Sequence, residues 1–240
     1  MESKSKQILV SLGSAVLRQS DIDNFQDGYW LNDSCITFYY EHLVKTLLPK
    51  DSKLPKIVLM DPSAASELIY SQFTGDPDQD ELLNDIYGPL GLHKTELAFI
   101  PVNDNTDRTK AAGGSHWSLL VYHRSANKWY QIDSMTISVT EQSKAMSRNI
   151  NYLVKPSETP IVESVSGCAK QDNSYDCGMY VLENTESILT EFIKQGGKSE
   201  FKIDGSILKG VTSSSVSAKR RQIMEIIGGY IEERRKAGQI

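Results

Sequence analysis

Asp176–Ile193 read DCGMYVLENTESILTEFI, and this stretch is the clearest helix in the sequence. Its apolar residues recur at the three- and four-residue spacing that places them on one face of an α-helix. The residues on this face are Val181, Leu182, Thr185, Leu189 and Phe192, of which only Thr185 is polar. Gly196-Gly197 follows and is typical of a helix end, where a left-handed residue is needed. The pattern predicts a helix that buries one face, with Cys177 in its first turn.

A cluster of β-rich segments precedes this helix. Aromatic and branched apolar residues, which favour strands, are frequent in Glu96–Val102 (ELAFIPV), His116–His123 (HWSLLVYH) and Lys128–Asp133 (KWYQID). Arg124–Asn127 is short enough to join the last two as a hairpin. Shorter strands are expected at 56–60 and 160–165, and helices at 30–48, from 61 onward, and at 81–87, 139–153 and 218–236. Because helices and strands do not alternate regularly, and no repeat or linker divides the chain, we expect one α+β domain over residues 1–240.

The composition is that of an ordinary globular protein and argues against two classes of partner. Of the 240 residues, 39% are hydrophobic and 24% charged, and the net charge is −5. Acidic and basic residues are mixed along the chain, so there is no basic stripe for nucleic acid. No stretch approaches the roughly 20 apolar residues of a membrane-spanning helix. We therefore expect neither a nucleic-acid partner nor a membrane.

The chain has three cysteines, Cys35, Cys168 and Cys177, with no C-x-x-C spacing. An odd number without that spacing argues against a disulfide framework and against a four-cysteine zinc site. It favours a reducing intracellular setting and implies no metal or other cofactor. Cys35 and Cys168 are interpreted as small core residues, which is how free cysteines usually behave.

Cys177 differs because it falls in the first turn of the predicted helix, with Ser174 or Asp176 available as a cap. Unpaired backbone N–H groups and the helix dipole favour a negative charge there, and reactive thiolates occur at such positions. Gly178 leaves the approach to the sulfur uncrowded. A buried cysteine at a helix start can also be a simple packing residue, so position alone does not settle the role.

A thiol nucleophile needs an imidazole to hold its proton and a third group to orient that imidazole. Among four histidines, His42 falls within a helix and His93 in a connection, while His123 stands beside Arg124 and is expected to be exposed. His116 begins a strand directly after a Gly-Gly pair, and Asp133 ends the hairpin partner of that strand. The two can meet at one edge of the sheet, although an aspartate at a strand end is otherwise often a turn residue.

The remaining requirement is a donor for the oxyanion that forms when a thiolate attacks a carbonyl. The backbone N–H of Cys177 is one candidate. Gln171, six residues earlier, can supply a side-chain amide, although a loop glutamine is normally only solvated.

Three runs resemble the ubiquitin-like-protein-specific proteases, the Ulp or sentrin-specific family of cysteine peptidases. They are GSHWSLLVY (114–122), YQIDS (130–134) and QDNSYDCGMYV (171–181), and WLND (30–33) also fits. The order His, Asp, Cys is that of this family. The resemblance implies a papain-like α+β fold with a central, mostly antiparallel sheet flanked by helices, and the catalytic cysteine at a helix N-terminus.

Within the family the sequence is most similar to the deneddylase branch, through LRQSD (17–21), NDN (103–105) and AAGGSHW (111–117). This implies a protease that cuts after the C-terminal Gly-Gly of the Nedd (Rub) modifier, trims its precursor and removes it from cullins and other proteins in the cytoplasm and nucleus. Carried over by residue, the implied roles are nucleophile Cys177, base His116, orienting acid Asp133 and oxyanion donor Gln171. Trp30 and Trp117 resemble the walls of a tunnel for the tail, and the other substrate contacts expected are Asp33, Asn103, Gly113 and Gly114.

Three other functions stay open at this point. A protease directed at SUMO or ubiquitin would use the same machinery. A modifier-binding module could keep the fold without activity, although it would not need an aligned Gln171, His116, Asp133 and Cys177. An acetyltransferase of bacterial-effector type reuses a similar triad, and the WLND run argues against it.

Overall fold

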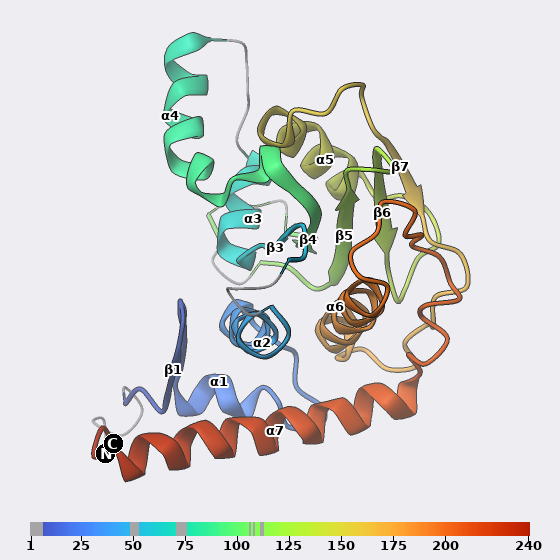
Figure 1. Ribbon diagram of the computed structural model, residues 1–240. Helices are drawn as coiled ribbons and strands as arrows, with labels where there is room; N and C mark the ends of the chain where they lie inside the picture. Colours follow the sequence, from blue (N-terminus) through green and yellow to red (C-terminus); the bar gives the residue numbers. More distant parts are fainter. Residues whose placement is uncertain (1–6, 49–52, 71–75, 106, 108, 111–112) are drawn as a thin grey trace.

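A five-stranded sheet runs through the centre of the part of the chain that the structure, a computed structural model, describes: residues 7–48, 53–70, 76–105, 107, 109–110 and 113–240 (Figure 1). Its strands lie in the order β3 (Lys56–Leu59), β4 (Thr95–Asn103), β5 (Trp117–His123), β6 (Lys128–Ile132) and β7 (Ile161–Ser164). The central pairs β4–β5 and β5–β6 are antiparallel, whereas β3–β4 and β6–β7 are parallel. The expected antiparallel arrangement therefore holds for the middle of a mixed sheet.

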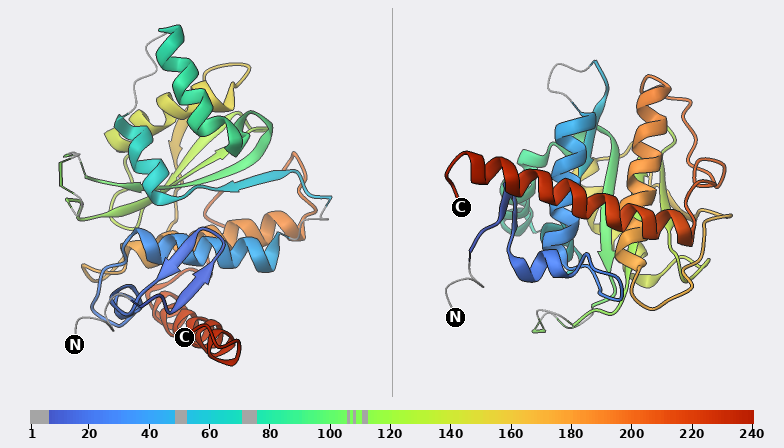
Figure 2. Two further views of the ribbon diagram at one scale, coloured as in Figure 1. Left: turned by 90° about the vertical axis from the view of Figure 1, so that its left-hand side faces the viewer. Right: turned by 90° about the horizontal axis from the view of Figure 1, so that it is seen from below.

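Helices cover both faces of this sheet (Figure 2). On one face lie α3 (Pro62–Tyr70), α4 (Pro77–Tyr87) and α5 (Glu141–Val154), with short 3₁₀ turns at Gly88–Leu90 and Leu92–Lys94. On the other lie α2 (Asp33–Leu47) and α6 (Cys177–Lys194), and α7 (Ser213–Lys236) crosses beneath both. The small α1 (Gln19–Asp23) and a hairpin of β1 (Val10–Leu12) and β2 (Ala15–Leu17) complete that side. Among the described residues we find no helix with the length and apolar character of a membrane span.

The central strands are buried on both faces, which explains their nearly continuous apolar sequences. Alternate side chains point to opposite sides of a strand, so each strand contributes to two separate cores. One core, shared with α2, α6 and α7, takes Leu97, Phe99, Leu119 and Val121. The other, shared with α3 and α5, takes Ala98, Ile100, Leu120 and Tyr122. Because β5 is buried along its whole length, its register cannot slip, and its first residue is held at a fixed edge.

The helix expected over 30–48 is α2, which Asn32 caps by accepting a hydrogen bond from Cys35 N at 3.0 Å. The helix end at Gly196-Gly197 is also confirmed, since both glycines have positive φ and their N–H groups bond to Ile193 and Phe192. The β1–β2 hairpin was not expected, and α4 begins earlier than the predicted 81–87.

The prediction that His123 is exposed is wrong. Its side chain is fully buried, with Nε2 3.2 Å from Glu96 Oε1 and its ring against Phe201. The neighbouring Arg124 turns its guanidinium toward backbone carbonyls of Leu92, Thr95 and Val154 instead of toward water.

The topology brings three chain segments to one edge of the sheet. His116 directly precedes β5 and Asp133 directly follows β6, and these strands are antiparallel with Leu119 opposite Ile132. Helix α6 packs on β5 and begins at Cys177. The three residues proposed from the sequence as a triad are therefore positioned by three buried elements.

Candidate active site

Cys177 is the first residue of α6, and only 3% of its surface is exposed. The glycine after it allows a close approach of the segment before α2: a Cβ placed on Gly178 would lie 2.9 Å from Leu31 Cβ. A glycine is therefore needed here for packing, and Leu31 lies directly over the start of the helix. The helix N-terminus supplies the positive end of the backbone dipole to this sulfur.

The His116 ring is fixed by Asp133. His116 Nε2 lies 2.9 Å from Asp133 Oδ1, and the same carboxylate oxygen accepts backbone hydrogen bonds from Met135 at 2.7 Å and Thr136 at 3.2 Å. Asp133 is 3% exposed. Burial raises the pKa of this carboxyl, but the hydrogen bonds and the charge of His116 outweigh burial and hold the pKa below its ordinary value. Asp133 therefore stays ionised and can stabilise an imidazolium.

The other nitrogen of His116 serves the thiol. Nδ1 is buried and has no hydrogen-bond partner within the described ranges, yet the Cys177 sulfur is near enough to affect the imidazole. Burial lowers the pKa of His116, while Asp133 and Cys177 together raise it by more, to about 9. The site thus favours a protonated imidazole that lies between the Asp133 carboxylate and the Cys177 sulfur.

The other cysteines lack these features. Cys35 is fully buried, and burial raises the pKa of its thiol to about 12. Burial also raises the pKa of Cys168 to about 11. Both thiols therefore remain protonated near neutral pH. Cys35 is the core residue that was expected, whereas Cys168 is only partly buried.

Gln171 lies on the loop that leads into α6, and its amide is held from both ends. Ser134 Oγ donates to Gln171 Oε1 at 2.6 Å, and Gln171 Nε2 donates to the carbonyl of Asn173 at 2.7 Å. The carbonyl of Asn173 can only accept, so the orientation of the amide is determined. One N–H of Gln171 is used in this contact and the second is left to donate elsewhere.

A cleft of about 640 Å³ leads to the sulfur, and eight of the ten residues proposed from the sequence line it: Trp30, Asp33, Asn103, Gly113, Gly114, His116, Trp117 and Cys177. Asp133 and Gln171 lie outside this set of lining residues. Trp117 is nearly buried, with its indole N–H donating to the carbonyl of Leu31 at 3.1 Å, whereas Trp30 is 47% exposed. The Trp117 side of the cleft is therefore held in place by packing and a hydrogen bond, whereas the Trp30 side lies at the protein surface.

Asp33 lies in this cleft, and the residues that shift its pKa are anionic or hydroxyl-bearing neighbours. Burial and the charge of Asp61 raise its pKa, and these outweigh the hydrogen bond from Ser63, whose hydroxyl lies 3.4 Å from Asp33 Oδ2. The cleft therefore contains a carboxylate that a positively charged ligand would stabilise.

Asp104 also positions the site, and the sequence analysis did not assign it a role. One oxygen of its carboxylate accepts from the backbone of Ser115 at 2.6 Å and of His116 at 2.9 Å, and the other accepts from Ser115 Oγ at 2.8 Å. Asp104 N donates back to the carbonyl of His116 at 3.1 Å. These bonds close the base of the loop in front of β5, and a lone aspartate at a strand end gave no signal of them.

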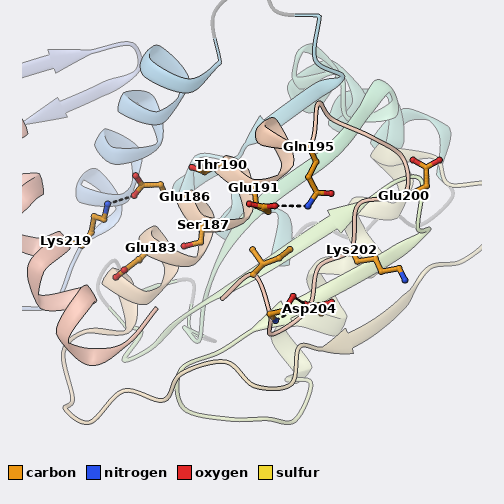
Figure 3. A pocket seen from close by; sticks show the side chains of 12 residues that line it. Glu183, Glu186, Ser187, Thr190, Glu191, Gln195, Glu200, Lys202, Asp204 and Lys219 are labelled. Carbon is orange, nitrogen blue, oxygen red and sulfur yellow. Dashed lines mark hydrogen bonds and ion pairs between the residues drawn. The ribbon is translucent and has the colours of Figure 1, made fainter. Parts of the chain in front are cut away.

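A second pocket, of about 750 Å³, lies along the C-terminal half of α6 and the chain that follows it (Figure 3). It shares no lining residue with the cleft and contains neither a histidine nor a cysteine. Some of its charges are already paired, since Lys219 Nζ lies 2.6 Å from Glu186 Oε2 and Gln195 donates to Glu191 (Figure 3). In the described ranges no group of three or more His, Cys, Asp or Glu side chains could hold a metal ion.

Comparisons with known proteins agree with this geometry. Residues 29–210 match the model of the Ulp1 protease family, C-terminal catalytic domain. The chain is 28% identical to human sentrin-specific protease 8, over 92% of this chain and 96% of that protein. It is 30% identical to NEDD8-specific protease 1 of Arabidopsis thaliana, over 94% of both.

Solved structures are similar in fold at lower identity. A de-sumoylating protease superposes with a TM-score of 0.66 over 98% of this chain and 96% of that one, at 17% identity. The C-terminal Ulp1 protease domain in complex with SMT3 gives a TM-score of 0.62 over 92% and 86%, at 19% identity. With a family model that covers most of its length, the chain belongs to the Ulp1 protease family of cysteine proteases specific for ubiquitin-like proteins.

Proposed function

We propose that this protease cleaves after the C-terminal Gly-Gly of the Nedd (Rub) modifier, both to process its precursor and to release it from cullins and other conjugates. The observation that carries the proposal is that Cys177 and His116 line a cleft together with Trp30 and Trp117, and that Asp133 holds the far side of the His116 ring. A binding module would need the cleft but not the buried imidazole–carboxylate pair beside a thiol at a helix start.

The chemistry follows from the protonation state of the site. The Cys177 thiolate attacks the carbonyl carbon of the last glycine, a C–S bond forms, and the carbonyl electron pair becomes an oxyanion. When the oxyanion collapses the C–N bond breaks, and the leaving amine takes the proton of the His116 imidazolium. Water then attacks the thioester and gives a proton to His116, and the sulfur leaves as thiolate.

Two donors stabilise the oxyanion in this proposal: the backbone N–H of Cys177, which is among the first, unpaired N–H groups of α6, and the second N–H of Gln171. The bond from Ser134 and the bond to Asn173 hold the Gln171 amide in place. A donor that is already oriented needs no rearrangement when charge develops, which is the condition for effective electrostatic stabilisation.

The proposed path of the tail accounts for a requirement for glycine. In this proposal the tail passes between Trp30 and Trp117, where residues without a Cβ atom allow the closest approach of the backbone to the rings. Gly114 likewise leaves space for the amide of Asn103, against which a Cβ would clash. We assign Asn103, Gly113 and Gly114 to contacts along the tail, and Asp33 to a basic residue that precedes the glycines.

The preference for Nedd rests on the relatives, since proteins named as sentrin-specific protease 8 and as NEDD8-specific match at 28% and 30% identity. We further propose that residues 1–240 act as a single catalytic domain in the cytoplasm and nucleus. A reducing compartment suits a nucleophile that must remain a free thiol, and all three cysteines are unpaired.

Selectivity tests the proposed substrate. Nedd, SUMO and ubiquitin, each with a C-terminal aminomethylcoumarin, should give a kcat/KM that is about 100-fold or more higher for Nedd, within the range that differential pocket contacts supply. Asp33→Asn should raise KM on Nedd with little effect on kcat, because its contact is made equally in ground and transition states. A higher kcat/KM on SUMO or ubiquitin would overturn the assignment to Nedd.

The oxyanion role of Gln171 predicts a loss in kcat. Gln171→Ala should lower kcat about 10²- to 10³-fold, the usual effect of removing one oxyanion donor. Gln171→Glu should be at least as damaging, because a carboxylate of the same shape opposes the developing charge. Gln195→Ala, an exposed glutamine at the other end of α6, is the matched control and should keep full activity. Wild-type kcat in Gln171→Ala would remove this residue from the mechanism.

The raised pKa of His116 predicts the alkaline limit of activity. Because the imidazolium must protonate the leaving amine, kcat/KM should fall as pH rises through about 9. Asp133→Asn removes groups that raise this pKa while burial, which lowers it, remains, so the alkaline limit should move to lower pH. Asp172→Asn, an exposed carboxylate on the neighbouring loop, should leave the limit in place. A limit that does not move in Asp133→Asn would contradict the role of the aspartate.

A further inference from the structure

Arg220 on α7 is a buried cation next to the nucleophile. It is 4% exposed, and its Nη2 lies 2.6 Å from Asp176 Oδ1, a carboxylate that is itself 3% exposed. Nη1 donates to the backbone carbonyls of Asn24 and Gln26, both at 2.9 Å. A guanidinium on α7 with contacts to two other chain segments is well suited to hold them in a fixed relation.

These segments carry the two sides of the site. Asp176 immediately precedes Cys177, and the chain through Asn24 and Gln26 leads to Trp30 and Leu31. A second link runs in parallel, since the Arg220 guanidinium lies 5.7 Å from the centre of the Tyr175 ring. The Tyr175 hydroxyl in turn donates to Asp27 at 3.1 Å. Arg220 thus connects the loop that ends at the nucleophile with the segment that forms the wall of the cleft.

Asp176 occupies the N-cap position of α6, but within the described residues its side chain makes no cap hydrogen bond to the helix. Its Oδ1 faces Arg220, and its Oδ2 accepts from Asn173 Nδ2 at 2.8 Å. A buried carboxylate beside Cys177 would by itself oppose a thiolate, because like charges disfavour each other's ionised forms. Removing one partner of a buried ion pair leaves exactly such an uncompensated charge.

We infer that Arg220 is a positioning residue for the nucleophile: it neutralises Asp176 and holds the Cys177 loop against the Trp30 segment. The last helix is then part of the catalytic apparatus, although it contributes no residue to the cleft. The inference rests on the proposed function in one respect, that Cys177 is the nucleophile.

Charged and titratable groups face this region from each element packed against it. On the sheet side they are His116 and Asp133, and Lys170 lies nearby with Nζ bonded to the carbonyls of Asp133 and Thr136. Around the Asp176–Arg220 pair they are Asp21, Asp27, Cys35, Asp172, Tyr175 and Tyr180. Among them Arg220 is the cation paired with Asp176, so its removal should change the field at the sulfur directly.

The test is the rate at which iodoacetamide alkylates Cys177, followed by peptide mass spectrometry from pH 4 to pH 9. This readout needs no substrate and distinguishes Cys177 from Cys35 and Cys168. The acid limit is the pH below which alkylation slows because the thiol is protonated. In Arg220→Gln this limit should move to higher pH by about one unit, so that alkylation below it is roughly tenfold slower. In Asp176→Asn, where Arg220 is left unpaired, the limit should move to lower pH by a similar amount.

Shifts of the acid limit in opposite directions in the two single variants identify the charges of Arg220 and Asp176 as the cause, because a loss of packing would not shift the limit in opposite directions. The double variant Asp176→Asn/Arg220→Gln should return the acid limit close to that of the wild type. Arg221→Gln, an exposed neighbour on α7, is the matched control and should change nothing. Thermal unfolding checks that each variant is folded, and if Arg220→Gln does not fold, the single Asp176→Asn and the double variant still decide.

The inference is overturned if folded Arg220→Gln keeps the wild-type acid limit, if Asp176→Asn moves it upward, or if the double variant is no closer to wild type than Arg220→Gln. Failure of the proposed function is a separate outcome. If no modifier is cleaved but the opposite alkylation shifts appear, Arg220 still tunes the thiol and only the substrate assignment is lost.

Discussion

The packing of α6 is the constraint on which the site depends. Nearly every residue from Cys177 to Thr185 is buried, between α2 on one side and the sheet at β5 on the other. A helix with so much buried surface cannot rotate or slide without opening the core, so its first residue is fixed relative to the first residue of β5. The cysteine and the histidine therefore meet because two buried elements begin at the same edge, and no flexible loop has to bring them together.

Charge compensation then sets the chemistry at this edge. His116 bonds to Asp133, Asp176 is paired with Arg220, and Asp33 in the cleft has its pKa raised by burial and by the charge of Asp61. Asp133 stabilises the protonated form of His116, and Arg220 neutralises Asp176 beside the Cys177 thiol. In the proposed function Asp33 receives a basic residue of the substrate, so recognition uses this carboxylate and catalysis uses the carboxylates that are paired inside the protein.

Local patterns in the sequence were sufficient for most of the elements, and a family resemblance proposed the three residues that the structure brings together. Helix α6, the β5–β6 hairpin and the capped α2 each follow from apolar spacing and turn chemistry, and the order of His116, Asp133 and Cys177 matched a known family. The β1–β2 hairpin was missed because three-residue strands carry too little periodicity. The parallel pairings of β3 with β4 and of β7 with β6 join segments that are distant in the sequence, and no local pattern predicts their register. Asp104 and Arg220 act through several hydrogen bonds and an ion pair to residues outside their own elements, which no local pattern indicates. His123 was misplaced because the guanidinium beside it turns inward.

Covalent trapping tests the central claim most directly. Nedd with its last glycine replaced by propargylamine presents an alkyne where the scissile carbonyl would lie, and a thiolate adds to it only when the tail is seated in the cleft. The account predicts one stable adduct per chain, mapped by mass spectrometry to Cys177, absent in Cys177→Ala and retained in Cys168→Ala. An adduct at Cys35 or Cys168, or an adduct that survives in Cys177→Ala, would contradict it.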